Sequence, residues 1–516
     1  MTYLSAAIAR KARTGLTAQL ARSRAIAAPT KGWNTRDPIF NMDPLFATIL
    51  DNWFPERGFV GIRRGFTEHA TGVGSGAVEA LHHYESGNTI DLLAMGGGAI
   101  YDATAAGAAT SLASGFSGNR WHGVNFNAVA LLGNGTDAPQ TYNGTTVTAT
   151  GWTGPSDVTK LKHPLVHKER VYWIEDGTAS FWFGGIDAIT GALSEFPLGT
   201  VFPGGGRLKA MGTFTHDGGN GPDDFVAFFM NSGDVLVYAG NDPADSTNWT
   251  LIGRYKIGRV IGSRPLLNIG PDLIAITADG FMPVEQFLRA GRSRRQLAVS
   301  DNIAPSVREA VRTFADNEGW QLTLYPRSNM MIANIPLVQN QQADQYVMNT
   351  LTGAWCRFTD INAASWEVSA DMAYFGGTGG KVFEFDSGNN DDGSAISTDA
   401  QTAFIYFGGT ESEKRYTMFR PTMTADSDLA VAMGLGVDFE ENVPTVNASS
   451  IPGSGAEWDV AEWDVAEWEG GFRQQSDWQS ADRVGRSAAI RLKTQTNGIN
   501  ARWFATDVVW ERGGII

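Results

Sequence analysis

The sequence predicts an all-β protein with an irregular β-propeller core, an additional C-terminal β domain and one short inserted helix. Three observations support this fold class. Glycine supplies 61 of the 516 residues, well above the usual ~7 %. Aromatic residues reach 11 %, whereas charged residues are only 18 %, so many turns accompany much flat apolar surface. Finally, short strand-like runs recur along most of the chain.

Residues 32–395 are predicted to form the β-propeller-like domain. Apolar runs of four to eight residues end at Gly, Asn, Asp or Pro, as strands do. Clear runs are 89–95, 128–132, 170–174, 225–229 and 235–238. An aromatic residue followed by a polar turn recurs at Tyr101, Tyr142, Trp182, Tyr238, Phe281, Tyr325 and Phe383, with spacings of 41, 40, 56, 43, 44 and 58 residues. A period of about 40–50 residues is typical of propeller blades; unrelated hairpins in a β-sandwich are the alternative.

One helix is predicted over residues 304–315. Pro305 suits the first helical turn, and Val307, Val311 and Phe314 fall on one face together with Ala310. We expect this helix to be an insertion packed on the β body.

The pattern changes near residue 396, and residues 396–516 are predicted to form a separate C-terminal β domain. Its strand-like segments are 402–407, 416–419, 429–439, 488–492 and 503–510. Between them, residues 456–468 repeat a five-residue unit that places Trp458, Trp463 and Trp468 in phase. Five matches neither the strand nor the helix period, so a loop is expected. The three indoles either cap the core of the domain or form an adhesive subunit interface, where Trp is favoured.

Residues 1–31 form a predicted basic N-terminal arm. Arg10, Lys11, Arg13, Arg22 and Arg24 lie in it, and the first acidic residue of the chain is Asp37. Three interpretations remain open: a transit peptide, which is Arg-rich and acid-poor, a solvated tail, or a docking arm that folds onto an acidic partner. In the third case, the five basic residues named are the candidate docking residues.

Net charge and cysteine content narrow the function classes. The chain carries a formal net charge of −15, so it is not expected to grip nucleic acid by neutralising phosphates. An acidic wall could still surround DNA without trapping it. Cys356 is the single cysteine, which excludes an intrachain disulfide. The sequence predicts no membrane span and no signal peptide, because apolar runs are short.

Catalytic and metal-binding motifs are incomplete in this sequence. We find no nucleophile elbow, phosphate-binding loop, dinucleotide fingerprint or zinc-protease helix motif. His82 and His83 are adjacent and so point to opposite faces of a strand, and Pro164 separates His163 from His167. The histidines are therefore expected at the surface or in the core, not at zinc. The sequence predicts no enzyme activity, no cofactor and no metal site.

Several motifs, taken in order along the chain, resemble a known family. They are residues 33–38 (WNTRDP), 50–55 (LDNWFP), 62–66 (IRRGF), 232–243, 249–253, 272–280, 352–355, 374–377, 381–386, the Trp repeat and residues 510–514. Together they resemble the tail nozzle family of short-tailed bacteriophages, also called tail tubular protein B. The resemblance covers about residues 32–514, and the basic arm lies outside it.

The resemblance implies a structural virion protein that is made in the host cytoplasm and assembled into the tail. It implies a ring, expected as a homo-hexamer, that lies below a portal adaptor, supports tail fibres or spikes and lets genomic DNA pass without specific binding. Two other functions remain open: a propeller glycosidase or depolymerase that clears the cell surface, and a sugar-binding adhesin that uses the three Trp residues as a stacking surface.

Overall fold

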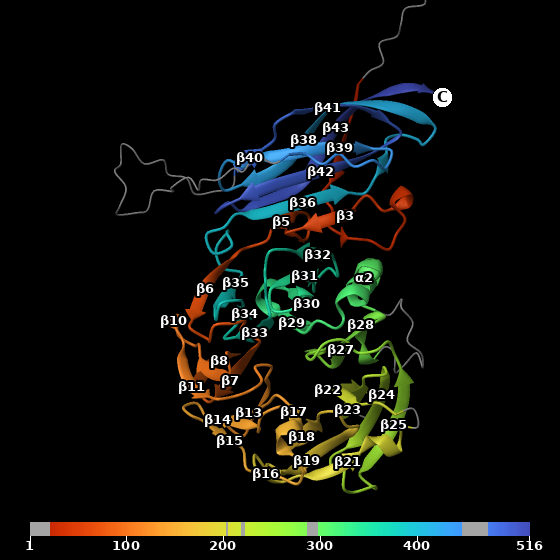
Figure 1. The fold of residues 1–516 in the computed structure, drawn as a ribbon. Coiled ribbons are helices and arrows are strands. Elements are labelled where there is room, and N and C mark those ends of the chain that lie inside the picture. The colour runs from red at the N-terminus through yellow and green to blue at the C-terminus, as the bar shows by residue number, and fades with distance from the viewer. Residues whose placement is uncertain (1–20, 203–204, 218–221, 286–297, 446–472, 516) are drawn as a thin grey trace, which may run out of the picture.

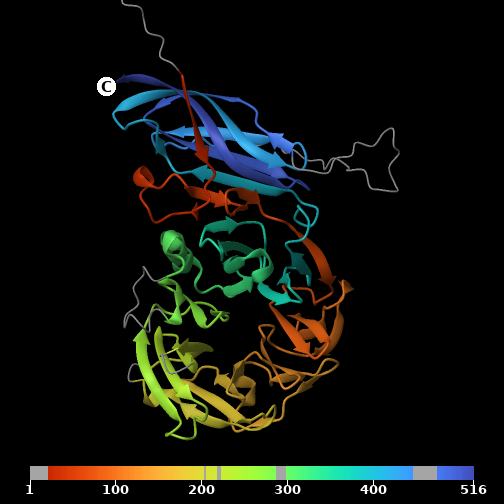
Figure 2. The ribbon, with the colours of Figure 1, turned by 180° about the vertical axis from the view of Figure 1, so that it is seen from behind.

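A computed structural model describes residues 21–202, 205–217, 222–285, 298–445 and 473–515. The predicted fold class is confirmed: the described chain is almost entirely β, with a propeller, a second β body and one α-helix. Figures 1 and 2 show the two bodies stacked, with the propeller as a ring of small sheets beneath the blue C-terminal strands.

Seven small sheets of the described residues form the blades of the propeller. Five of them use successive strands of the chain: β7 (Ala80–Ser86), β8 (Thr89–Gly96), β9 (Ala99–Asp102) and β11 (Thr110–Ser114); β12 (His122–Phe126), β13 (Val129–Gly133), β14 (Gln140–Tyr142) and β15 (Val147–Ala149); β17 (Leu161–His167), β18 (Arg170–Glu175), β19 (Ser180–Ile186) and β21 (Ser194–Pro197); β22 (Leu208–Asp217), β23 (Pro222–Met230), β24 (Asp234–Gly240) and β25 (Trp249–Lys256); and β26 (Leu266–Ile269), β27 (Asp272–Thr277) and β28 (Gly280–Pro283). The sixth blade holds β29 (Gln321–Tyr325), β30 (Met330–Val338), β31 (Gln342–Asn349) and β32 (Trp355–Phe358). A short parallel pair, β16 (Trp152–Thr153) and β20 (Gly191–Ala192), lies beside the third blade.

The seventh blade closes the ring with a strand from the start of the chain. Its own strands are β33 (Ser365–Ser369), β34 (Met372–Gly376) and β35 (Val382–Phe385), and β6 (Phe66–Thr71) pairs antiparallel with β35. The two-residue β10 (Gly107–Ala108) extends this sheet beyond β6. The first strand of each blade contacts the first strands of its neighbours, in the closed order β7, β12, β17, β22, β26, β29, β33 and back to β7. Each of the seven predicted aromatic anchors lies in a different blade.

The second body is a β-sandwich that includes strands from the N-terminal part of the chain. One sheet contains β38 (Ser412–Ala425), β43 (Ala501–Ile515), β40 (Arg473–Gln475), β41 (Gln479–Gly485), β1 (Arg22–Ala27), β4 (Trp53–Pro55) and β5 (Val60–Ile62). The facing sheet contains β36 (Ile396–Thr402), β37 (Ile405–Tyr406), β39 (Val431–Val437), β42 (Ser487–Thr496) and β3 (Phe46–Asp51). The predicted division at residues 31 and 395 therefore does not follow the pairing of the strands, since residues 22–62 supply four strands to the sandwich. These pairings connect residues hundreds of positions apart, which local sequence patterns do not encode.

The propeller and the sandwich are joined by one continuous sheet and a common core. β2 (Gly32–Trp33) pairs parallel with both β32 and β3, so the sixth blade continues into the sandwich. Gly32 has φ +84°, and a Cβ there would lie 2.4 Å from the carbonyl oxygen of Trp355, so only glycine fits. Trp320 and Trp355 from the propeller share a buried cluster with Trp503 from the sandwich.

The predicted helix is confirmed as α2 (Ala304–Phe314), which packs against β28 and β30. Pro305 lies in its first turn; Val307, Ala310 and Val311 are buried, and Phe314 packs partly buried on the same core. No helix in the described parts of the chain is long and apolar enough to cross a membrane.

Candidate functional site

The axis of the propeller contains a polar cavity of about 300 Å³. Its lining comes from the first strand of each of the seven blades and from the segments that lead into them. The polar members are His82, His122, His163, Thr213, Arg264, Asn268, Gln321 and Glu367. Strands alternate their side chains between two faces, so each inner strand turns only part of its residues toward the axis. This cavity gathers titratable groups from five blades in one space.

Three histidines meet in this cavity although about 40 residues separate each from the next. The rings of His122 and His163 stack with centroids 4.2 Å apart. Nε2 of His163 lies 2.8 Å from the carbonyl oxygen of Ser263, which can only accept, so this nitrogen carries a proton. Nε2 of His82 lies 3.0 Å from Asn125 Oδ1. Burial lowers the pKa of His82 and of His163 to about 4, so the rings stay neutral at neutral pH.

Arg264 and Glu367 supply opposite charges to the same cavity. The Arg264 guanidinium donates from Nη2 to the carbonyl oxygen of Trp121 at 2.6 Å and from Nη1 to Gln321 Oε1 at 3.3 Å. Burial lowers the pKa of Arg264 to about 10 and raises that of Glu367 to about 7, although each charge favours the other. Glu367 is the one carboxylate among the described residues that line this cavity.

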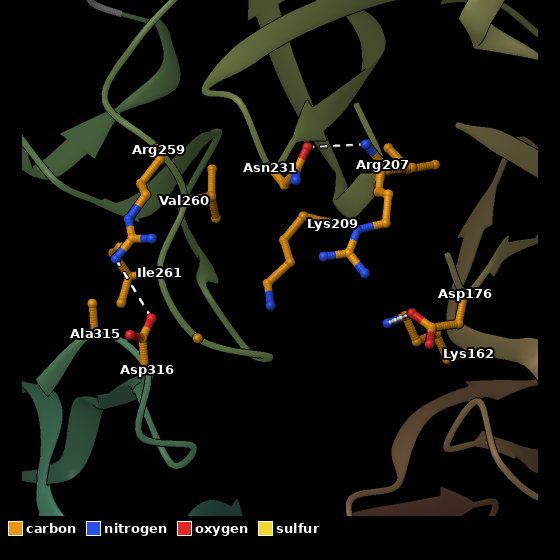
Figure 3. A pocket seen from close by; sticks show the side chains of 12 residues that line it. Lys162, Asp176, Arg207, Lys209, Asn231, Arg259, Val260, Ile261, Ala315 and Asp316 are labelled. Carbon is orange, nitrogen blue, oxygen red and sulfur yellow. Dashed lines mark hydrogen bonds and ion pairs between the residues drawn. The ribbon is translucent and has the colours of Figure 1, made fainter. Parts of the chain in front are cut away.

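A second pocket of about 280 Å³ lies where the inner strands β17 and β22 begin, next to the axial cavity. Lys162, Arg207, Lys209 and Arg259 line it, together with Asp176 and Asp316 (Figure 3). Along β17, Lys162 of this pocket comes directly before His163 of the axial cavity, and along β22, Lys209 comes two residues before Met211, so the two spaces follow one another along the strands. We call this space the basic mouth.

The largest of these spaces is a cleft of about 650 Å³ between the propeller and the sandwich. Arg64, Arg327 and Arg502 line it beside Glu56 and Asp386. The Arg502 guanidinium lies over the Phe59 ring, 5.0 Å from its centroid, and Ser328 Oγ donates to Asp386 Oδ2 at 2.5 Å. The lining of this cleft therefore contains both positive and negative side chains.

The structure describes only part of the predicted docking residues. Arg22 and Arg24 lie on β1, where their guanidinium groups stand 5.4 Å from the Trp510 ring centroid and 5.9 Å from that of Phe407. Both residues thus take part in the sandwich and are exposed on its edge strand. Arg10, Lys11 and Arg13 lie outside the described residues, as do Trp458, Trp463 and Trp468. The docking and interface roles stay predictions.

The described residues contain no cluster of metal ligands and no accessible thiol. No three side chains of His, Cys, Asp or Glu come together as metal ligands there. Cys356 is fully buried, and burial raises the pKa of its thiol. His82 and His83 do point to different neighbours, since His83 Nδ1 lies 2.9 Å from Ser369 Oγ on β33.

The sequence contained a signal for the axial cavity that the predictions above did not use. His82, His122 and His163 are separated by 40 and 41 residues, the spacing of the neighbouring aromatic anchors. Residues at equal positions of successive blades face the same axis, so a shared period predicts that the three rings converge. Arg264 and Glu367 have no such period and could not have been found this way.

Comparisons with known proteins identify similar folds only. No protein-family model and no curated protein sequence matches this chain. Among solved structures, it is similar to the WD40 domain of Pan2 from Neurospora crassa, at 8 % identity and a TM-score of 0.38 over 63 % of this chain and 96 % of that one. It is also similar to Sqt1 from Saccharomyces cerevisiae (8 %, TM-score 0.39, 66 % and 96 %) and to the computationally designed Ika8 protein (12 %, TM-score 0.36, 62 % and 99 %). Similarity at this level carries no information about function.

Proposed function

We propose that this chain is a structural subunit of a ring-shaped bacteriophage tail nozzle, below the portal adaptor, that forms the channel for genomic DNA and supports tail fibres. The observation that carries the proposal is the order of the family-like motifs over residues 32–514. On the structure these motifs lie in both bodies: residues 50–55 include β4, residues 272–280 include β27, and residues 510–514 lie in β43. The propeller and the sandwich would then both be parts of the nozzle subunit.

The way the two bodies are joined supports a load-carrying role. A shared sheet and a shared core of buried Trp side chains connect the propeller to the sandwich, so a force on one body is transmitted to the other. The axial cavity of about 300 Å³ has the size of a small-molecule site, which leaves no passage for a duplex. We therefore infer that the DNA channel lies between subunits.

The proposed partners are further copies of the chain, the adaptor and the fibre or spike proteins, within the tail of the virion. The mixed-charge cleft at the junction of propeller and sandwich offers a surface for one of these contacts. The basic arm would meet an acidic face of the adaptor or of a neighbouring subunit, because opposite surface charges steer association.

Imaging the purified full-length chain tests the proposal. Negative-stain images and sedimentation should give a closed ring with the mass of a homo-hexamer. A triple variant with Trp458→Ala, Trp463→Ala and Trp468→Ala should lose the ring, whereas Trp478→Ala, at an exposed indole of the sandwich, should keep it. Monomers at every concentration, and a chain that is absent from purified particles, would overturn the proposal.

A second function, glycoside hydrolysis, is favoured by one observation. The pKa of Glu367 is raised to about 7 by burial, as suits a general acid. Most glycosidases need a second carboxyl group at about 5 Å or 6.5–9.5 Å, and the described cavity lining holds Glu367 alone. Release of reducing sugar from host polysaccharide by the wild type, lost in Glu367→Gln, would support hydrolysis over the nozzle. An adhesin would instead lose cell adsorption in the triple Trp variant while its particles assemble.

A further inference from the structure

We propose that the basic mouth of the propeller binds a phosphate group in its monoester or inorganic form. This inference is independent of the proposed function. Figure 3 shows the Arg207 and Lys209 side chains extending into one open space, with Arg259 on one side and Lys162 on the other. Four cationic side chains thus surround a pocket of about 280 Å³ in a chain whose net charge is −15.

Two of the four cations, Lys162 and Arg259, pair with a carboxylate, and the other two have no carboxylate partner among the described residues. Lys162 pairs with Asp176, and Arg259 Nη2 lies 3.7 Å from Asp316 Oδ1, whose side chain is fully exposed. The Arg259–Asp316 pair is long and exposed, and such pairs are weak, whereas Lys162 and Asp176 form a close, partly buried pair. Among the described residues, neither Arg207 nor Lys209 makes a side-chain hydrogen bond or an ion pair. An anion in the pocket would therefore meet donors that no protein group occupies.

Because Lys209 is partly buried, leaving its ammonium without a counterion costs free energy. Lys209 is a partly buried residue of β22, and burial lowers the pKa of its ammonium, against the favourable charge of Glu318. A partly desolvated charge gains more from a counterion than an exposed one does. Binding an anion would offset the desolvation of Lys209.

The backbone holds Arg207 at the edge of the pocket. Its N–H donates to Asn231 Oδ1 at 2.9 Å, and the Asn231 N–H donates to the Arg207 carbonyl oxygen at 2.9 Å. This reciprocal pair joins the start of β22 to the turn between β23 and β24. The guanidinium is thereby anchored at its root, while its planar fork of donors stays available to a tetrahedral oxyanion.

Size and lining select a small, strongly charged anion. About 280 Å³ is at the small end of the range for ligand pockets, and buried Val260 and Ile261 form part of the wall. A phosphate dianion matches a fork-shaped guanidinium beside a point-charge ammonium. The phosphodiesters of a duplex are held along a wide rod and cannot enter such a recess, so a terminal or free phosphate is the ligand class.

Calorimetric titration of the full chain with inorganic phosphate tests this site. We expect saturable binding of one phosphate per chain, weakened at least about tenfold in Lys209→Met and in Arg207→Gln, because each removes a charge-assisted hydrogen bond. Lys256→Gln is the matched control: this lysine lies on β25 of the same blade, is 63 % exposed and pairs with Asp234. Phosphate should also raise the melting temperature of the wild type, but not that of Lys209→Met.

Competition separates the sources of the phosphate. A single-stranded oligonucleotide with a 5′ phosphate should displace inorganic phosphate, whereas the same strand without it should not. Equal displacement by both strands would place the contact on the nucleic-acid backbone and overturn the proposal. The absence of saturable phosphate binding would also overturn it, as would equal phosphate affinity of the wild type and of Arg207→Gln. Because the Arg207 side chain is exposed, this variant is expected to fold.

Discussion

The guanidinium of Arg63 is completely buried and joins three segments of the chain. Its Nη2 and Nη1 donate to the two carboxylate oxygens of Asp391 at 2.6 and 2.7 Å, and its Nε donates to Asn52 Oδ1 at 2.8 Å. The Arg63 side chain is 0 % exposed and that of Asp391 7 %. Asp391, in the segment between β35 and β36, is therefore held in a buried ion pair with Arg63.

Removing one partner of this pair should be severe. Asp391→Ala leaves a buried guanidinium without its counterion, and we expect the free energy of unfolding to fall by about 3–5 kcal/mol, measured by urea unfolding. Glu309→Ala, which breaks the exposed pair with Arg312 on α2, should leave the free energy of unfolding nearly unchanged, because water screens an exposed ion pair. Equal effects of the two variants would contradict the importance of burial.

The axial histidines should make stability depend on pH. In the unfolded chain these rings take up protons near pH 6.5, but in the folded chain the pKa of His82 and of His163 is about 4. Between these values the unfolded state binds more protons, so stability falls as pH falls from 6.5 toward 4. Glu367 acts in the opposite sense: its pKa rises from 4.5 to about 7, so its contribution falls as pH rises from 4.5 to 7.

Melting temperatures measured from pH 4 to 8 would separate these two contributions. His82→Gln should flatten the loss of stability below pH 6.5, and Glu367→Gln should flatten the loss between pH 4.5 and 7. Arg264 faces these groups and keeps its charge over the range, because its pKa is about 10, so it shifts the curves without adding a slope. If the variants had the same pH profile of stability as the wild type, burial of His82 and Glu367 would not be the cause of the pH dependence.

At the scale of the elements, β1 shows why the basic arm is not a single unit. β1 pairs antiparallel with β43 over its whole length, from Arg22 opposite Trp510 to Ala27 opposite Ala505. Ile26 is 4 % exposed and belongs to the core between the two sheets of the sandwich. Residues 22–27 therefore contribute to folding, whatever residues 1–20 do.

Truncations that end on either side of β1 should behave differently. A chain that lacks residues 1–20 should keep the melting temperature of the wild type, because every described contact of the sandwich is retained. A chain that lacks residues 1–31 should melt earlier, and Ile26→Ala should cost about 2–5 kcal/mol in a full-length chain. If the shorter truncation already lowers the melting temperature, residues 1–20 pack on the fold.

Local patterns predicted the elements well and their partners poorly. The run 170–174 became β18 and the helix at 304–314 was found, because periodicity and turn residues act within a few positions. The closing strand β6 and the sandwich strand β3 were not assigned, since their partners β35 and β36 lie over 300 residues away. Any alternating strand could satisfy such an edge, so sequence alone does not choose. In the axial cavity only the three histidines shared a period that indicates convergence, whereas the positions of Arg264 and Glu367 depend on the long-range closure of the ring.

On the scale of the whole molecule, the net charge of the chain and the charge of the basic mouth have opposite signs. The chain is acidic overall, with −15 in total and −22 outside the first 36 residues, yet the basic mouth concentrates four cations at one end of the propeller axis. Net charge governs encounters with a long polyanion, whereas a recessed pocket governs a small ion. A chain of this kind can repel a duplex and still bind a phosphate.

Duplex DNA should therefore not bind the full-length chain, even at low salt. Proteins that grip phosphates lose affinity steeply between about 50 and 200 mM salt because counterions are released; here we expect no binding at either end of that range. Fluorescence anisotropy with a dephosphorylated duplex measures this, and leaving the 5′ ends bare excludes the basic mouth from the result. The chain without residues 1–20 is the matched control, since it lacks Arg10, Lys11 and Arg13. Salt-sensitive binding that disappears in this control would assign a DNA contact to the arm, and binding that persists would contradict a repelling channel wall.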